Sequence, residues 1–256
     1  KGYDTPGYDL LALMHGSEGM LGIVVEVIVQ LLPKPSEGAV IMAAFSNVMN
    51  AANSVSGVIS AGLLPAGLEM MDKLAIQAAE SFVGAGYPEA AEAMLLCELD
   101  GSLEELAEQI ESVRAVFDSN DCITFTVAFD AVERQKLWLG RKAAFPAVGR
   151  IAPDYYCMDG TIPRRELAQV LQAITDLSHK YKLQVANVFH AADGNLHPLI
   201  LYDANNSDQL TRAEAFGSEI LALCIEKGGT ITGEHGVGIE KINEMCLQFN
   251  RDELGV

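Results

Sequence analysis

The fold of this chain is most constrained by the alternation of short β-rich runs with longer helical runs after Pro35. The pattern predicts strands at residues 39–45, 67–71, 93–99, 122–129, 155–162, 185–190 and 196–202. It predicts helices at residues 48–61, 73–83, 103–117, 164–181 and 207–227, with a last helical stretch reaching Phe249. We therefore expect an α+β fold, a ferredoxin-like antiparallel sheet with helices packed on one face.

A separate feature precedes this alternation. Residues 21–32 are rich in valine, isoleucine and leucine, follow a glycine-rich turn and end at Pro33-Lys34-Pro35. The run predicts a strand that ends at a domain boundary. It is too short to span a bilayer, and Glu26 and Gln30 interrupt it. We expect residues 1–35 and 36–256 to belong to different domains.

Composition excludes several classes of protein. Half of the 256 residues are hydrophobic and 20% are charged, as is ordinary for a soluble globular protein. The formal charge of −18 would repel nucleic acid and anionic lipid. The five cysteines are scattered and show no C-x-x-C spacing, which argues against a disulfide framework and indicates a reducing compartment. We expect a cytoplasmic protein without a transmembrane segment.

The residues with the clearest chemistry surround a predicted hairpin turn. His190 and His197 lie at the two ends of the turn that contains Asp193-Gly194-Asn195. A hairpin would bring both imidazoles to the same end of the sheet, where they could share one zinc, iron or manganese ion. The alternative is two histidines that hydrogen-bond to backbone groups beside a polar turn.

A glycine-rich segment near the end of the chain contains an acid and a base side by side. Five glycines fall between Gly228 and Gly238, and they flank Glu234 and His235. Glu234 could complete a metal site of two histidines and one carboxylate, with His235 beside it as a general base. The alternative is a flexible loop with a solvated Glu-His pair.

Together these two segments resemble a known signature. The pattern H-x-x-D-G-N-L-H followed by G-x-x-x-G-E-H-G-x-G is similar to that of the FAD-linked oxidase C-terminal domain family. This family belongs to the vanillyl-alcohol-oxidase-type flavoenzymes and includes dehydrogenases of D-lactate, D-2-hydroxyglutarate and glycolate. Residues 15–23 resemble the end of the FAD-binding domain of these enzymes, and residues 151–163 resemble the glycolate-oxidising branch of the family.

The resemblance implies a role for individual residues. His190, His197 and Glu234 would be the metal ligands, His235 the catalytic base, and Arg141 the residue that holds the substrate carboxylate. The residues that would contact the flavin are Gly16, Ser17, Glu18, Gly19, Gly22 and Ile23. The implied cofactors are FAD and a divalent metal, which is zinc, iron or manganese.

The resemblance also implies the domain division. Residues 1–35 would be the C-terminal tail of an FAD-binding domain, and residues 36–256 a substrate domain truncated at its C-terminal end. Because most of the FAD-binding domain is missing, we expect this chain alone to be inactive and to bind no flavin.

Substrate size and partners follow from the same comparison. Phe145, Cys157 and Leu199 stand where dicarboxylate-specific members carry polar groups, which favours a small 2-hydroxy acid such as glycolate or D-lactate. Other oxidase subunits would carry electrons onward and could attach the protein peripherally to the inner face of the membrane. Two alternatives remain: a metal-dependent hydrolase that uses the same ligands, and a non-catalytic assembly domain.

Overall fold

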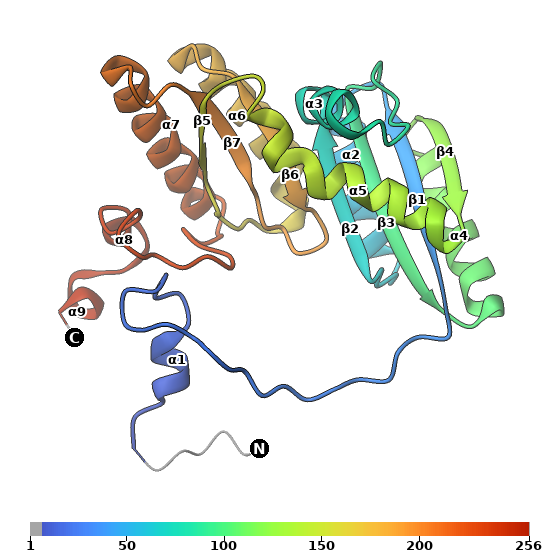
Figure 1. Cartoon of the computed structure of the whole chain (residues 1–256), viewed down its shortest axis with the longest axis horizontal. Helices are drawn as coiled ribbons and strands as arrows, with labels where there is room; N and C mark the ends of the chain where they lie inside the picture. The colour runs from blue at the N-terminus through green and yellow to red at the C-terminus, as the bar shows by residue number, and fades with distance from the viewer. Residues whose placement is uncertain (1–6, 256) are drawn as a thin grey trace.

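The computed structural model describes residues 7–255. Within that range a seven-stranded sheet has the strand order β4-β1-β3-β2-β6-β7-β5, and its neighbouring strands pair antiparallel (Figure 1). The strands are β1 (Glu37–Phe45), β2 (Gly67–Asp72), β3 (Ala93–Gly101), β4 (Cys122–Ala128), β5 (Asp154–Cys157), β6 (Val185–His190) and β7 (Pro198–Tyr202). The predicted α+β fold with an antiparallel sheet is confirmed.

The first half of the sheet has the ferredoxin-like order. Its four strands lie in the order β4-β1-β3-β2, which is the split β-α-β arrangement. The helices of this half are α2 (Val48–Ser60), α3 (Lys73–Val83) and α4 (Leu103–Asp118). At the start of α4 the Ser102 side chain accepts from Glu105 N while the Glu105 carboxylate accepts from Ser102 N, which forms a capping box.

Strand β6 joins the two halves of the sheet. Residues 185–187 pair with β7, whereas residues 188–190 pair with β2, where His190 is opposite Glu69. Helices α6 (Leu167–Tyr181) and α7 (Ser207–Glu226) pack beside this half (Figure 1). The change of partner within β6 places His190 beside Glu69, on a strand from the first half.

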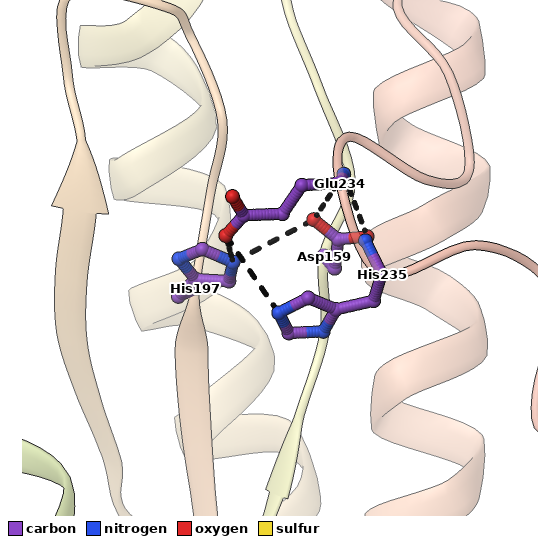
Figure 2. A group of neighbouring side chains, drawn as sticks. All are labelled: Asp159, His197, Glu234 and His235. Atoms are coloured by element: carbon purple, nitrogen blue, oxygen red, sulfur yellow. Dashed lines mark hydrogen bonds and ion pairs between the residues drawn. The ribbon is translucent and has the colours of Figure 1, made fainter. Parts of the chain in front are cut away.

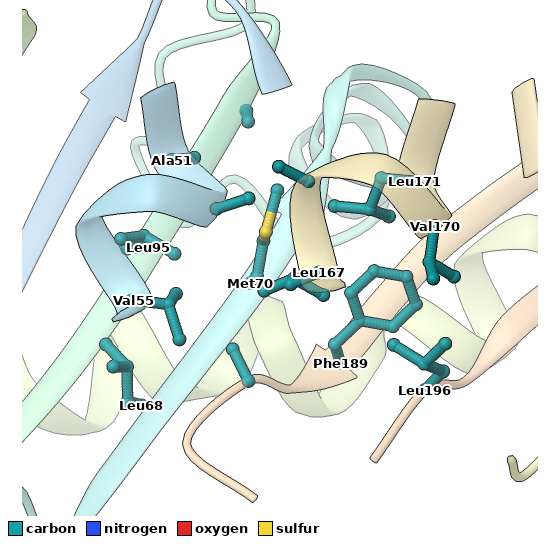
Figure 3. Close-up of a cluster of buried hydrophobic side chains, with 14 of the residues drawn as sticks. Ala51, Val55, Leu68, Met70, Leu95, Leu167, Val170, Leu171, Phe189 and Leu196 are labelled. Carbon is teal, nitrogen blue, oxygen red and sulfur yellow. The ribbon is translucent and has the colours of Figure 1, made fainter. Parts of the chain in front are cut away.

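Helices cover both faces of the sheet, not the one face predicted. Alternate residues of β1 point to opposite sides: Ile41 packs with α2 and α4, while Val40 packs with α3 and with α5 (Ala131–Val148). The first of these cores continues under α6 through Phe189 and Leu171 (Figure 3). Since the strand is buried on both faces, both need a helical layer. Helix α5 was not predicted from the sequence.

The prediction of a strand at residues 21–32 is wrong. The structure has no strand there, and the side chains of Ile23, Val25 and Ile28 are 87%, 92% and 85% exposed. A β-rich run forms a strand only beside another strand that accepts its backbone hydrogen bonds, and none lies beside it within residues 7–255. Residues 1–6 of the predicted N-terminal domain lie outside the described range.

Smaller differences concern where elements end. The strand predicted at 155–162 stops at Cys157, and Thr161 forms only isolated bridges. The helix predicted at 164–181 begins as the 3-10 turn η1 (Arg164–Glu166) before α6. The remaining helices are α1 (Leu10–Met14), α8 (Met245–Gln248) and α9 (Arg251–Leu254). None of the helices in residues 7–255 is long and apolar enough to cross a membrane.

Candidate functional site

The hairpin between β6 and β7 brings the two histidines together. His190 ends β6, His197 directly precedes β7, and a bridge between His190 and Asn195 closes the turn. The two imidazole rings lie 5.1 Å apart between centroids, nearly perpendicular at 84°. Their Nε2 atoms lie 3.5 Å and 3.2 Å from the same oxygen, Oε1 of Glu234. One carboxylate oxygen therefore stands between both rings.

The glycine-rich loop brings His235 to the same oxygen. Its Nε2 lies 3.7 Å from Glu234 Oε1, and its ring stacks on the His197 ring at 5.1 Å and 19° (Figure 2). The loop can approach this closely because Gly233 has no side chain: a Cβ there would lie 2.5 Å from Asn195 Oδ1. Three imidazoles thus surround one carboxylate oxygen.

Asp159, for which no sequence motif predicted a role, holds this loop in place. The side chain is fully buried. It accepts hydrogen bonds from Thr232 Oγ1 (2.7 Å), Gly233 N (3.1 Å), Glu234 N (3.1 Å), His235 N (2.8 Å) and Lys241 Nζ (3.2 Å). Burial alone would raise the pKa of Asp159, but the neighbouring His197, these donors and the Lys241 charge outweigh it and hold the pKa well below its usual range.

The residues present fit a divalent cation. His197 is 2% exposed, and neither of its ring nitrogens has a hydrogen-bond partner within residues 7–255. A buried polar group left unpaired costs about 1–3 kcal/mol, so a cation beside Nε2 would remove a penalty. Ligand atoms of Asp159, His197, Glu234 and His235 all lie within 4.8 Å of one another. Asp159 already accepts hydrogen bonds from the loop and from Lys241, most of them on Oδ2. His197 and Glu234 are therefore the less engaged ligands, with His190 on the other side of Glu234 Oε1.

Glu69, which was not predicted from the sequence either, connects the site to Arg141. Its Oε1 lies 2.7 Å from His190 Nδ1, and its Oε2 accepts from Arg141 Nε at 2.9 Å and Nη2 at 2.8 Å. The bond to Glu69 raises the pKa of His190 by more than burial lowers it. Because the Glu69 carboxylate can only accept, His190 donates to it from Nδ1, and in the neutral ring the lone pair is then on Nε2, the nitrogen that faces Glu234. Arg141 is buried, and Glu69 links it to His190.

The N-terminal glycine motif lies against the loop of His235. Gly16, Glu18 and Gly19 have positive φ angles of 69°, 49° and 80°. A Cβ added at Gly236 would lie 2.3 Å from the Cα of Gly16, so the two backbones are in contact there. The residues predicted to contact flavin are mostly exposed: Gly16, Ser17, Glu18, Gly19, Gly22 and Ile23. They therefore form an open surface next to the histidine cluster.

The three residues that we expect to set substrate size lie close to His197. The Phe145 ring is 6.3 Å from the His197 ring, between centroids. Cys157 on β5 is the register partner of Leu199 on β7, two residues beyond His197. Burial, with Asp159 nearby, raises the pKa of the Cys157 thiol to about 12. The wall beside His197 is therefore apolar and uncharged.

With this geometry established, comparison with known proteins assigns the family. Residues 34–256 match the family model described as FAD linked oxidases, C-terminal domain, and the chain belongs to that family.

Curated relatives are dehydrogenases and oxidase subunits. The chain is 57% identical over 251 residues to glycolate oxidase subunit GlcD of Escherichia coli (strain K12), covering 98% of this chain and 50% of the relative. It is 40% identical to glycolate oxidase subunit GlcD of Bacillus subtilis, covering 97% and 53%. It is 29% identical to the mitochondrial D-lactate dehydrogenase [cytochrome] of Arabidopsis thaliana, covering 98% and 43%. The chain spans about half the length of these relatives.

Solved structures support the fold alone. The 4-ethylphenol oxidase of Gulosibacter chungangensis superposes with a TM-score of 0.66 at 14% identity, covering 88% of this chain and 50% of that one. An alkyldihydroxyacetonephosphate synthase superposes with a TM-score of 0.61 at 13% identity, covering 88% and 45%.

Proposed function

We propose that this chain is the substrate side of an FAD-dependent dehydrogenase that oxidises a small 2-hydroxy acid, glycolate or D-lactate, to the 2-oxo acid. The observation that carries the proposal is the convergence of His190, His197 and His235 on one oxygen of Glu234. Membership of the FAD linked oxidase family and the names of the relatives support the same reaction class.

The proposed metal ligands are His190, His197 and Glu234. A divalent ion held there (zinc, iron or manganese) supplies Lewis-acid polarisation of the substrate hydroxyl group. His235 is the proposed general base, and its Nε2 accepts the hydroxyl proton. Stacking of its ring on the His197 ring and the hydrogen bond from His235 N to Asp159 fix where that nitrogen points.

FAD, when bound, supplies the acceptor for the hydride that leaves the α-carbon. The exposed loop from Gly16 to Ile23 is the proposed contact for the flavin ring. Its backbone contact with Gly236 puts it next to the proposed base. Residues 1–35 would accordingly be the tail of the FAD-binding domain, with residues 36–256 as the substrate domain.

Arg141 is the proposed partner of the substrate carboxylate. Two of its nitrogens are held by Glu69, while Nη1 has no hydrogen bond within residues 7–255. A guanidinium fixed on one edge presents its other nitrogen in a defined direction, which suits the recognition of a carboxylate. Glu69 is thus a positioning residue for both Arg141 and His190.

The apolar wall favours a small substrate. Phe145, Cys157 and Leu199 offer no cation to a second carboxylate, and a buried carboxylate without a partner is strongly disfavoured. We therefore expect glycolate or D-lactate to be preferred over D-2-hydroxyglutarate. The word "subunit" in the name of the relatives supports further oxidase subunits as partners.

Flavin reduction in single turnover tests this function. The full-length protein is mixed without oxygen with glycolate, D-lactate or D-2-hydroxyglutarate, and the loss of flavin absorbance is followed. We expect the first two acids to reduce the flavin faster, and His235→Ala to stop reduction while the remote, exposed His179→Ala does not. Faster reduction by D-2-hydroxyglutarate would contradict the substrate size, and no reduction by any 2-hydroxy acid would contradict the function.

A further inference from the structure

A cavity that the proposed reaction does not use lies between the edge strand β5, helix α7 and residues 239–244. Its volume is about 560 Å³, within the range of roughly 300–1,000 Å³ usual for small-molecule sites. Its aromatic and acidic lining residues are Tyr155, Tyr156, Tyr202, Glu214, Glu240 and Glu244, and the neutral polar side chains of Ser218 and Asn243 line it as well. The cavity is therefore both aromatic and acidic.

Glu244 in this cavity has a carboxylate oxygen without a hydrogen-bond donor in the described part of the chain. The residue is 8% exposed, and its Oε1 accepts a hydrogen bond from Ser218 Oγ at 2.5 Å. Its other oxygen, Oε2, is buried and has no hydrogen-bond partner in the described part of the chain. A buried carboxylate oxygen without a donor is costly, and a ligand that donates to it would remove that cost.

No lysine, arginine or histidine is among the described residues that line the cavity. Lys241, the nearest cation along the chain, is itself buried and pairs instead with Asp159 at 3.2 Å. The uncompensated charge affects the neighbouring phenol: burial first, and then the charges of Glu240, Glu244 and Glu214, raise the pKa of Tyr156 to about 12. The described lining is therefore negatively charged, and no positive side chain in it neutralises the glutamates.

The chemistry of the lining favours one kind of cation. Tyrosine rings attract a cation over their faces, and a planar guanidinium can stack on a ring while donating to two carboxylates at once. We propose that this cavity binds a guanidinium group, carried by a small molecule or by an arginine side chain of another polypeptide. The site is separate from the proposed metal site and does not depend on it.

Calorimetric titration of the full-length protein tests the proposal. The probes are N-acetyl-arginine amide and its uncharged isostere N-acetyl-citrulline amide. We expect the arginine probe to bind and the citrulline probe to bind at least about tenfold more weakly, because only the first brings a charge to the buried carboxylate. Glu244→Gln should weaken the arginine probe by at least about tenfold. The matched control is Glu104→Gln, which makes the same charge change at an exposed residue of α4.

Further arms separate the outcomes. Glu240→Gln replaces Glu244→Gln if the latter fails to fold by circular dichroism, and the same weakening is expected. Agmatine binding as tightly as an arginine-containing tripeptide would indicate a small molecule as the ligand, and tighter binding of the tripeptide would indicate a polypeptide. Equal binding of arginine and citrulline probes, no heat from the arginine probe up to its solubility limit, or unchanged affinity in both glutamate variants would overturn the proposal.

Discussion

Replacement of Asp159 by asparagine should cost this protein a large part of its stability. The carboxylate is fully buried, and its two oxygens serve the backbone N–H groups of the loop as well as Lys241. Asparagine keeps the shape but loses the charge, and it turns an NH₂ group toward groups that are themselves donors. Lys241, only 1% exposed, would be left buried without a counter-charge.

The magnitude follows from this geometry. Removing one partner of a buried ion pair costs about 3–5 kcal/mol, most of it for the charge that remains. A typical domain is stable by only about 5–15 kcal/mol, so Asp159→Asn should consume a large fraction of the total. Lys241→Met in the same chain removes the stranded cation. The double variant should therefore be more stable than the sum of the two single effects predicts, with a coupling energy of roughly 1–3 kcal/mol.

Urea-induced unfolding of the wild type, both single variants and the double variant, followed by circular dichroism, measures these quantities. Lys241→Met alone should cost less than Asp159→Asn, because Asp159 keeps its hydrogen bonds to the loop. A cost below about 1 kcal/mol for Asp159→Asn, or strict additivity in the double variant, would refute the reasoning.

Three further predictions concern the support of the site and the sheet. Glu69→Gln should lower metal affinity by about 10–100-fold by loosening His190, measured by chelator titration; unchanged affinity would contradict that role. Gly236→Ala puts a Cβ 2.3 Å from the Cα of Gly16 at a φ of 97° and should reduce the flavin retained by the full-length protein, read from absorbance; normal flavin content would contradict the loop contact. Burial raises the pKa of Asp72 from 3.8 to about 6, so its stabilisation is present at low pH and is lost as pH rises through 6. Relative to Asp72→Asn, the wild type should therefore lose up to about 3 kcal/mol between roughly pH 4 and pH 7, measured by urea unfolding at each pH; a constant difference would contradict the shift.

Much of the fold could be predicted because its signals are local. A continuous apolar run, residues 39–45, marks strand β1, and the Ser102-Glu105 capping box marks the start of α4. The run at residues 21–32 has the same β-rich composition but forms no strand, because pairing depends on a neighbour and not on the run itself. Helix α5 was not assigned because most of its buried residues are small, such as Gly140 and Ala144, and because Pro146 lies inside it.

The residues of the site also differ in whether the sequence could predict them. His190, His197, Glu234 and His235 stand in two compact motifs, so the sequence alone suggested that they act together. Glu69 is a single acid within a buried strand, and its partners lie 72 and 121 residues further along the chain. A single acid of this kind has no periodic or motif signal, and only the pairing of β2 with β6 brings it to His190.

The most direct test of the account measures metal content and turnover together in the full-length protein. Elemental analysis and a glycolate or D-lactate assay are made on His197→Ala, His235→Ala and the remote His179→Ala. We expect His197→Ala to lose both metal and activity, because it removes a ligand. His235→Ala should keep its metal but lose turnover, because it removes the base, and His179→Ala should keep both. Full metal content and full activity in His197→Ala would contradict the central claim that this histidine cluster is a catalytic metal site.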